Sequence, residues 1–595
     1  MRILGHKAYE NLGCHDIGDG KYHFAVWAPH AKAVSLVGDF NSWEQNQNPM
    51  KKNKNGIWDI TIDSPKYGDV YKYAVTSEKG ETVLKSDPFA FHSETGPATG
   101  SKVYKPLDFN WTDQKWLERR AKSKPQSEAI CIYELHLGSW RVPEEAEFPW
   151  YREVAVQLSE YCNEMNYTHV EIMPVTEYPF EGSWGYQPTG YFAPTSRYGT
   201  PEDFQFFVNT LHEAGIGVIM DWVPAHFPKD EHGLVCFDGT PLFEGWDKKM
   251  AEHAHWGTMC FDYGNPNVRD FLVSSAMFFF EYYHIDGLRV DAVSSMLYLD
   301  YGREKGQYTP NEDGGNISYK AAEFLRELNT AVLSTYPGAI TSAEESTAFP
   351  LVTAPPYDGG LGFTFKWDMG FMHDTLDYFS MDPLFRKGAH EKLSFSMMYA
   401  FSENFILPFS HDEVVHGKAS MLNKMHGDYE QKFATLRSLF AYQYAHPGKK
   451  LNFMGSEFGQ FIEWNNKQEL DWMLLDYPSH SSLKSFVSEL NLFYIKHSQL
   501  FEIDDSWDGF EWKSVDEREK SSIAFIRRNR AGKGVLCAFN FTPVEMTIHL
   551  PMPPRSRPRT LFSSNELRFG GTGEKAKYSK GMLTIPPLTA VFLTA

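Results

Sequence analysis

The spacing of apolar residues changes twice along the chain and divides it into three parts. Up to about residue 105, short apolar or alternating runs are separated by Gly, Pro and Asn, which predicts an all-β domain. From about residue 500 similar runs return, as at 534–541 and 581–585. The middle part alternates strand-like runs with amphipathic helical stretches. We therefore expect a central α/β domain between two β domains.

The middle part contains eight strand-like runs, with helical stretches such as 201–214, 268–283 and 319–334 between them. Eight alternating β and α units predict a (β/α)8 TIM barrel with its helices outside. This part exceeds the ~250 residues of a typical barrel, so we expect insertions in its loops, one of them reaching from 223 to 261. The eight runs are 130–137, 169–175, 217–223, 287–293, 339–344, 363–367, 405–409 and 451–453.

These patterns predict a chain of several domains, as its 595 residues also suggest. A polar stretch rich in Lys, Arg, Gln and Ser contains Trp116 and Leu117, and we expect it to form a short linker helix. The predicted parts are an N-terminal β-sandwich over 1–108, the linker over 109–128, the barrel over 129–495 and a C-terminal antiparallel β domain over 496–595.

The composition argues against several partners and locations. A formal net charge of −20 disfavours binding to nucleic acid or to an anionic membrane surface. The N-terminus lacks an apolar stretch of signal-peptide length, and the most apolar stretch, near 275, meets Glu281 long before the ~20 residues of a membrane span. Six scattered cysteines without CxxC spacing are typical of a reducing compartment. We expect a cytoplasmic monomer.

Acidic residues stand at the ends of four of the predicted strands. Soluble chains rarely place them there, because an ionised carboxylate is costly to bury unpaired. Acids at the carboxyl ends of separate strands form the active site of a (β/α)8 barrel, and carboxylates about 5–5.5 Å apart carry out retaining glycoside chemistry. The pattern therefore predicts chemistry on sugars. The acids are Asp221, Asp291, Glu344 and Asp412.

Polar neighbours of these acids refine the prediction. Arg289 lies two positions before Asp291, so on a strand both side chains point the same way and the guanidinium can keep the carboxylate ionised. A purely structural ion pair is the alternative. Glu344 is followed by Glu345, and the segment 411–413 reads His-Asp-Glu. Neighbouring residues on a strand face opposite ways, so the spacing alone does not say which of these acids enters a site.

No metal or cofactor motif is complete. Asp221 and His226 form a further polar pair at the end of the third run. The segment 411–416 (HDEVVH) superficially resembles the zinc motif H-E-x-x-H, but its two histidines are five positions apart, not the four that share a helix face. The segment 252–255 lacks a second ligand pair, and 311–316 lacks the spacing of a calcium loop. A phosphate-binding glycine loop and a dinucleotide fingerprint are also missing from the sequence. We expect no metal and no organic cofactor.

Four segments resemble, in order and spacing, the signature regions of the α-amylase superfamily, and four others are similar to those of the 1,4-α-glucan (glycogen) branching enzymes. The segment 24–43 is similar to the isoamylase-type carbohydrate-binding module, and the likeness to branching enzymes extends over nearly the whole chain. The superfamily segments are 221–226 (DWVPAH), 287–292 (GLRVDA), 343–347 (AEEST) and 410–414 (SHDEV). The branching-enzyme segments are 184–190 (WGYQPTG), 226–234 (HFPKDEHGL), 366–374 (KWDMGFMHD) and 411–418 (HDEVVHGK).

The resemblance implies a role for each site residue. Asp291 is implied to be the nucleophile, Glu344 rather than Glu345 the acid/base, and Asp412 the stabiliser of the transition state. One departure is Ser456, where the family usually has Asn. The residues implied to surround the sugar at the cleavage point are Tyr186, Asp221, His226, Arg289 and His411.

The resemblance also implies a reaction, a double displacement on an α-glucan such as glycogen, amylose or a starch-like polymer. An α-1,4 chain is cleaved, its segment is held as a covalent glycosyl-enzyme, and a 6-hydroxyl takes the segment to form an α-1,6 branch, the branching step of glycogen biosynthesis. A hydrolase on the same scaffold, debranching or trehalose-releasing, would pass the same intermediate to water. An inactive glucan-binding protein is the third alternative, and intact Asp291, Glu344 and Asp412 argue against it.

Overall fold

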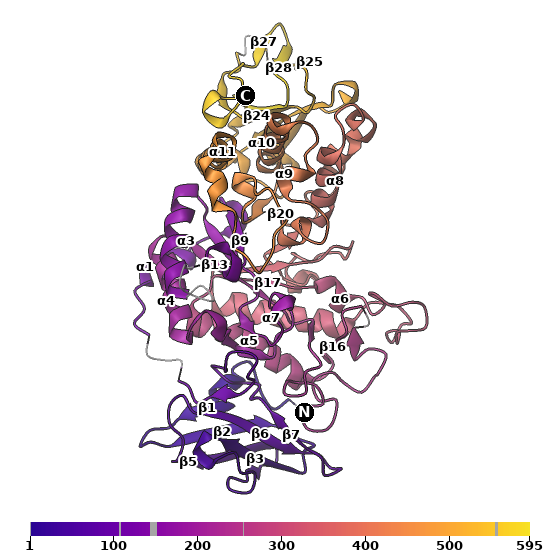
Figure 1. Ribbon diagram of the computed structural model, residues 1–595. Helices are drawn as coiled ribbons and strands as arrows, with labels where there is room; N and C mark the ends of the chain where they lie inside the picture. The colour runs from indigo at the N-terminus through magenta and orange to yellow at the C-terminus, as the bar shows by residue number, and fades with distance from the viewer. Residues whose placement is uncertain (1, 106–108, 143–150, 254, 554–556) are drawn as a thin grey trace.

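The computed structural model describes residues 2–105, 109–142, 151–253, 255–553 and 557–595. Three parts follow one another along the molecule, with the indigo N-terminal strands at one end and the yellow C-terminal strands at the other (Figure 1). The barrel lies between them, which agrees with the β, α/β, β order predicted from the sequence.

The N-terminal strands form a β-sandwich. Its two sheets meet at an aromatic contact, where the rings of Phe24 and Tyr71 lie with centroids 5.0 Å apart. One sheet contains β1 (Gly13–Asp16), β2 (Tyr22–Trp27), β5 (Ile57–Ile62) and β4 (Lys51–Lys52). The other contains β3 (Ala33–Gly38), β6 (Val70–Thr76) and β7 (Thr82–Lys85), with β8 (Ser101–Lys102) paired to β6.

The eight predicted runs form a closed barrel of parallel strands, which confirms the predicted fold class. Its strands are β9 (Cys131–Leu135), β10 (His169–Ile172), β13 (Gly217–Trp222), β17 (Gly287–Val290), β18 (Ile340–Ala343), β19 (Phe365–Trp367), β20 (Phe405–Phe409) and β21 (Lys449–Phe453). Its longer helices are α3 (Tyr151–Met165), α4 (Pro201–Glu213), α5 (Pro266–Tyr283), α7 (Tyr319–Thr335), α8 (Met369–Ser380), α10 (Tyr429–Ala445) and α11 (Pro478–Lys496). Shorter helices are α2 (Leu137–Trp140), α6 (Val293–Leu297) and α9 (Met421–Lys424).

The alternation of side chains along each strand separates the barrel interior from its outer surface. In β13, Ile219 belongs to an apolar cluster with residues of the other strands, including Ile132, Ile340 and Leu451. Its neighbours Val218 and Met220 belong instead to the large core that also contains the helices. The interior cluster fills the lower part of the barrel, so polar side chains are left to the carboxyl ends of the strands.

The loop after β13 contains the predicted insertion, which forms a small sheet. Its strands are β14 (His226–Phe227), β16 (Thr258–Cys260) and β15 (Glu252–His253), in that order. The insertion also contacts the N-terminal domain, because the ammonium group of Lys85 donates to the carbonyl oxygens of Glu231 at 2.6 Å and Val235 at 2.7 Å. A second small sheet, β11 (Thr176–Glu177) and β12 (Gly190–Pro194), follows β10.

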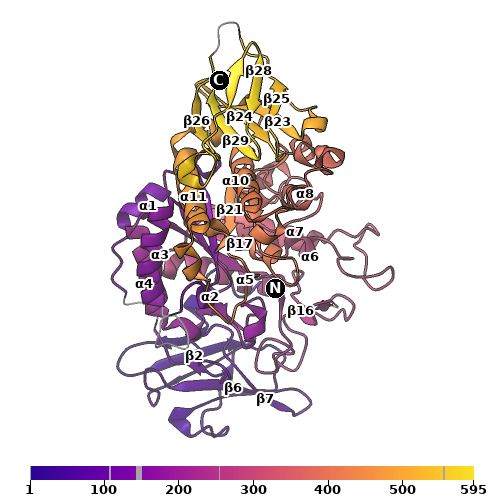
Figure 2. The same cartoon turned by 45° about the horizontal axis from the view of Figure 1, so that its top comes forward.

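The linker helix α1 (Gln114–Arg120) is bound to the barrel, where the indole of Trp116 donates to Asp286 at 2.8 Å. The C-terminal domain is antiparallel, as predicted, and packs above α10 and α11 (Figure 2). One sheet contains β22 (Phe510–Ser514), β23 (Ser522–Arg528), β24 (Gly534–Asn540), β29 (Thr589–Thr594) and β26 (Thr560–Ser563). The other contains β25 (Met546–His549), β28 (Met582–Ile585) and β27 (Lys577–Ser579). Across the described ranges, no helix is both long and apolar enough to cross a membrane.

Candidate active site

The carboxyl ends of the barrel strands surround a cavity of 350 Å³. Asp291 follows β17, Glu344 follows β18, and His411 and Asp412 follow β20. Seven of the eight predicted site residues line the cavity, and Asp221 in β13 lies buried beside them. The seven are Tyr186, His226, Arg289, Asp291, Glu344, His411 and Asp412.

One guanidinium holds three of the carboxylates together. Nη1 of Arg289 donates to both oxygens of Asp221, at 2.7 and 2.8 Å, and to Oδ1 of Asp291 at 2.8 Å. Its Nη2 lies 3.1 Å from Oε2 of Glu344. Arg289 is only 1% exposed, so these contacts lie in a region of low dielectric, where they fix the positions of the acids strongly. The expected alignment of Arg289 with Asp291 is confirmed.

The turn after β17 brings Glu344 beside Asp291. Ala292 adopts a left-handed backbone conformation, with φ of 53° and ψ of 39°, which L residues other than Gly seldom adopt. In this conformation its N–H donates to Oε2 of Glu344 at 2.7 Å. A strained turn therefore positions two carboxyl groups from neighbouring strands in one cavity.

His411 is held in place by a buried acid of the barrel interior, Glu134, which is not among the predicted site residues. Glu134 in β9 accepts the backbone N–H of His411 at 3.0 Å and contacts its Nδ1 at 2.6 Å. The other ring nitrogen, Nε2, therefore faces the cavity, 3.2 Å from the hydroxyl of Tyr186 and 3.4 Å from Oδ1 of Asp412. The hydroxyl of Tyr186 also donates to Asp221 at 2.6 Å.

The acids around the cavity differ in pKa. Burial raises the pKa of Asp291 well above its usual range, against the opposing effect of Arg289, and the charge of Glu344 adds to the rise. Burial also raises the pKa of Glu344, again opposed by Arg289. The neighbouring His411 lowers the pKa of Asp412, whose side chain is 45% exposed. The site thus favours an ionised Asp412 and one retained proton in the pair of Asp291 and Glu344.

The two histidines of the cavity also differ in pKa. Burial opposes the charge on His411, but Asp412 and Glu134 raise its pKa to about 9. His226 has its Nε2 3.9 Å from Oδ2 of Asp291, and burial lowers its pKa to about 3. At neutral pH the cavity therefore contains a charged His411, whose ring nitrogens only donate hydrogen bonds, and a neutral His226, which has one donor and one acceptor nitrogen.

The structure separates the acids that the sequence spacing left undecided. Glu345 is fully buried and lies 2.6 Å from the ammonium group of Lys366, away from the cavity that Glu344 lines. In the second case, Asp412 lines the cavity, and Glu413 accepts from Lys418 at 3.0 Å.

Several residues of the site were missed from the sequence. Glu134 and Glu171 are acids within predicted strand runs, a signal that could have been noticed, and both are 1% exposed inside the barrel. Trp256 and Tyr301 also line the cavity, and Trp256 stacks on the ring of His253 with centroids 3.7 Å apart. Both aromatic residues come from irregular loops, whose positions no periodic pattern predicts.

A set of three potential metal ligands lies elsewhere, on the outside of the barrel. His6, Asp270 and Glu327 have ligand atoms close together. The guanidinium of Arg2 is already ion-paired with both of these acids, so the site's negative charge is compensated by the protein itself. These residues fit an ion-pair network better than a cation site.

Three family models match parts of the chain. They are carbohydrate-binding module 48 (isoamylase N-terminal domain) over 11–90, the α-amylase catalytic domain over 154–235 and the α-amylase C-terminal all-β domain over 512–595. Each matched range lies within the part of the structure that has the corresponding architecture.

Curated relatives match over almost the full chain. A 1,4-alpha-glucan branching enzyme of Aquifex aeolicus is 50% identical over 99% of this chain and 96% of its own length. Those of Halothermothrix orenii and Aromatoleum aromaticum are each 48% identical over 99% of this chain, covering 96% and 94% of their own lengths.

Solved structures with low sequence identity share the fold. The catalytic module of the glycogen-degrading pneumococcal virulence factor SpuA superposes with a TM-score of 0.77 at 16% identity, over 98% of this chain and 97% of that one. A pullulanase from Paenibacillus barengoltzii, solved with maltohexaose and α-cyclodextrin, gives 0.76 at 17% identity, over 98% and 95%.

Proposed function

The chain belongs to the 1,4-α-glucan branching enzymes, and from this membership we propose that it is a retaining glycosyltransferase of glycogen biosynthesis. It cleaves an α-1,4 bond of a glucan chain and transfers the released segment to a 6-hydroxyl, which forms an α-1,6 branch. The relatives that are 48–50% identical over 94–96% of their own lengths support this activity.

In the first step, a carboxylate oxygen of Asp291 attacks the anomeric carbon while Glu344 gives its proton to the departing glycosidic oxygen. In the second step, Glu344 removes the proton from the acceptor 6-hydroxyl, whose oxygen forms a bond to the anomeric carbon as the bond to Asp291 breaks. The contact of one guanidinium with both acids supports these roles, because it places them in one cavity on neighbouring strands.

The remaining predicted residues are proposed to bind the sugar at the cleavage point. Asp412, with its lowered pKa, offers a fixed negative charge to the positive sugar ring of the transition state. Tyr186, His226 and His411 line the same cavity and offer hydrogen-bonding groups to sugar hydroxyls. Asp221 is 2% exposed and is proposed to act from beneath, by holding Arg289 and Tyr186 in place.

The observation that carries this proposal is the set of acids at three strand ends around one cavity, on a chain with near-full-length branching-enzyme relatives. The decisive experiment is incubation with amylose while iodine colour and reducing ends are followed together. Loss of colour at constant reducing ends, with new chains released by isoamylase, would support transfer. A rise in reducing ends equal to the number of bonds cleaved would show that water is the acceptor and would contradict the proposal.

The nucleophile is tested by Asp291→Asn. This variant should lose turnover and keep glucan binding, because the amide preserves the shape of the side chain and removes the attacking oxygen's charge. An undiminished rate would refute the assigned role. The loss of turnover also separates this proposal from that of an inactive glucan-binding protein, for which the substitution should change nothing.

We further propose that the enzyme acts on an α-glucan polymer as a cytoplasmic monomer without a cofactor. The match to carbohydrate-binding module 48 over 11–90 supports a polymeric substrate, and the six cysteines are all free thiols, which fits a reducing compartment. The domain boundaries proposed from the sequence are kept at 108, 128 and 495. Limited proteolysis and light scattering test the boundaries and the monomer.

A further inference from the structure

A second cavity, larger than the catalytic one, lies on the other side of a shared wall. Its volume is 640 Å³, against 350 Å³ for the cavity with Asp291. The helix α6 contributes to both, because Ser294 lines the catalytic cavity and Ser295 lines the second one. The following turn does the same, with Tyr301 on the catalytic side and Arg303 on the other.

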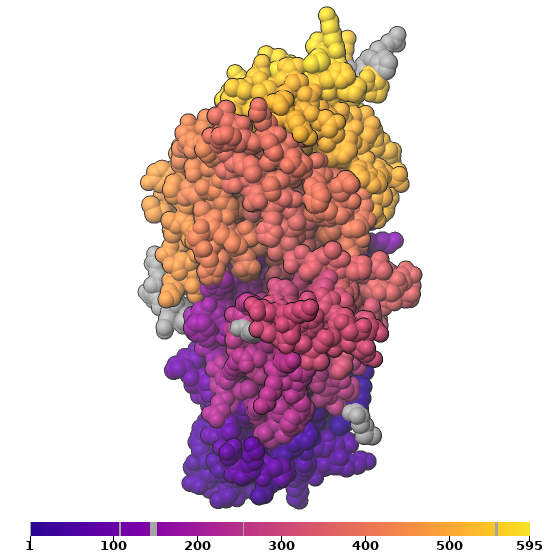
Figure 3. All heavy atoms as spheres, turned by 90° about the vertical axis from the view of Figure 1, so that its right-hand side faces the viewer, coloured from indigo at the N-terminus to yellow at the C-terminus, as the bar shows by residue number. Residues whose placement is uncertain are grey.

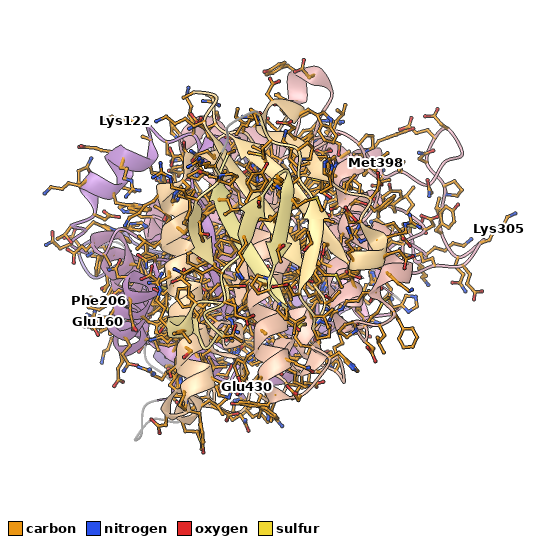
Figure 4. All side chains as sticks on the ribbon, turned by 90° about the horizontal axis from the view of Figure 1, so that it is seen from above. Lys122, Glu160, Phe206, Lys305, Met398 and Glu430 are labelled. Atoms are coloured by element: carbon orange, nitrogen blue, oxygen red, sulfur yellow. The ribbon has the colours of Figure 1, made fainter. Side chains whose placement is uncertain are left out.

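The turn shared by the two cavities is hydrogen-bonded to the insertion after β13. Arg303 donates to the carbonyl oxygen of Glu252 at 2.8 Å, so the 298–303 turn is fastened to the small sheet of the insertion. Figure 3 shows the face of the molecule on which these segments lie, with the magenta and red atoms of the barrel insertions across its middle. In Figure 4, Lys305, two residues beyond Arg303, projects outward from the edge of the molecule.

The side chains of the second cavity suit a sugar chain. The indole of Trp246 is 70% exposed and Tyr319 is 47% exposed, and both line the cavity, so two large aromatic residues are available to pack against apolar ring faces. The carboxylate of Asp247 adds a group that can bind hydroxyls, whereas the amide of Asn311 is held by hydrogen bonds within its own loop.

Other ligand classes fit less well. Four acids line the cavity against two cations, and one cation, Arg303, is already bonded to backbone carbonyls, so the cavity does not favour a phosphate or another anion. Polar groups around the aromatic rings disfavour a purely apolar ligand. The acids are Glu244, Asp247, Asp262 and Glu312, and the cations are Arg303 and Lys320.

We propose that this cavity binds the acceptor glucan chain. The inference rests on the proposed function, because a branching transfer brings two chain segments to one covalent intermediate, and only one of them occupies the cleavage point. The catalytic cavity accommodates the donor at Asp291 and Glu344. The second cavity, which shares α6 and the following turn with it, holds a neighbouring part of the chain whose 6-hydroxyl attacks.

The test is Trp246→Ala, with Trp507→Ala as a matched control. Trp507 is a similarly exposed indole, 55% exposed, in the C-terminal part of the chain and outside both cavities. Each variant is given amylose as donor and increasing concentrations of a short-chain glucan acceptor, and branches and reducing ends are counted separately.

Loss of Trp246 should raise the acceptor concentration for half-maximal branching about tenfold, as for removal of an aromatic contact, while donor cleavage continues and more of it ends in hydrolysis. Trp246→Phe should recover most of the branching, and Trp507→Ala should behave as the unaltered enzyme. An unchanged acceptor dependence would overturn the proposal. So would an equal loss of cleavage and branching in Trp246→Ala, because that would indicate a donor or structural role.

The two proposals fail in different ways. Absence of branching in the unaltered enzyme would refute the proposed function and the acceptor site together. Normal branching by the unaltered enzyme, with no change in Trp246→Ala, would refute the acceptor site alone.

Discussion

Substitution of Arg289 by Met tests the electrostatic organisation of the site most directly. The change keeps an unbranched side chain and removes the guanidinium that contacts three acids. Asp221 and Asp291 would then remain 2% and 7% exposed without their cation. Breaking a buried ion pair in this way costs about 3–5 kcal/mol, so we expect a loss of that size in the free energy of unfolding at neutral pH.

The loss should depend on pH, with a definite sign. Arg289 lowers the pKa of Asp291 and Glu344, opposing the rise caused by burial. Without Arg289 these carboxyl groups have a folded-state pKa further above the unfolded value of about 3.9–4.3, so the folded variant loses stability as the pH rises above that value. The difference from the unaltered enzyme should therefore be small near pH 4 and grow as the pH rises towards neutral.

Arg386→Met is the matched control. Arg386 is as deeply buried, at 0% exposure, but its guanidinium donates to the carbonyl oxygens of Phe379 and Phe541, both at 2.8 Å, which do not titrate. Urea unfolding at several pH values, followed by tryptophan fluorescence, should show a pH-dependent loss for Arg289→Met and a constant loss for Arg386→Met. Equal pH dependence in both variants, or a larger loss for Arg289→Met in acid, would refute the reasoning.

Three further predictions concern single residues. Glu344→Gln should lower the transfer rate by at least about a hundredfold, and the rate should recover with a glycosyl fluoride donor, whose leaving group needs no proton. Glu345→Gln should instead lower thermal stability, with no such recovery of rate, because Glu345 is fully buried against Lys366. The charged His411, with a pKa raised to about 9, contributes stability that is complete below about pH 6.5 and lost as the pH rises through 9. The loss in the free energy of unfolding caused by His411→Gln should therefore shrink by about 3 kcal/mol over that range. A loss that grows with pH in urea unfolding would contradict this. Lys85→Met should speed proteolytic release of the N-terminal domain, because Lys85 donates to carbonyls of the barrel insertion, and an unchanged cleavage rate would argue against that contact.

The fold could be predicted from the sequence because its signals are local. Each barrel strand is a short apolar run, and α4, α5 and α7 fall on helical stretches predicted from the sequence, so the eight strands can be predicted without any tertiary contact. In a parallel barrel the carboxyl ends of all strands meet at one face. Acids at strand ends therefore had to gather there, and Asp291, Glu344 and Asp412 do line one cavity, with Asp221 buried beside them.

Tertiary structure decided what the spacing of residues leaves open. Glu344 and Glu345 are neighbours in sequence, and their directions depend on the turn beyond β18 and on partners such as Lys366 and Ala292. Glu134 acts on His411 across 277 residues, a pairing that no local pattern encodes. The second cavity is formed by irregular loops, whose conformation depends on long-range hydrogen bonds such as that of Arg303 to Glu252. Local periodicity fixed the strands and the face of the barrel, while long-range contacts fixed which side chains enter the site.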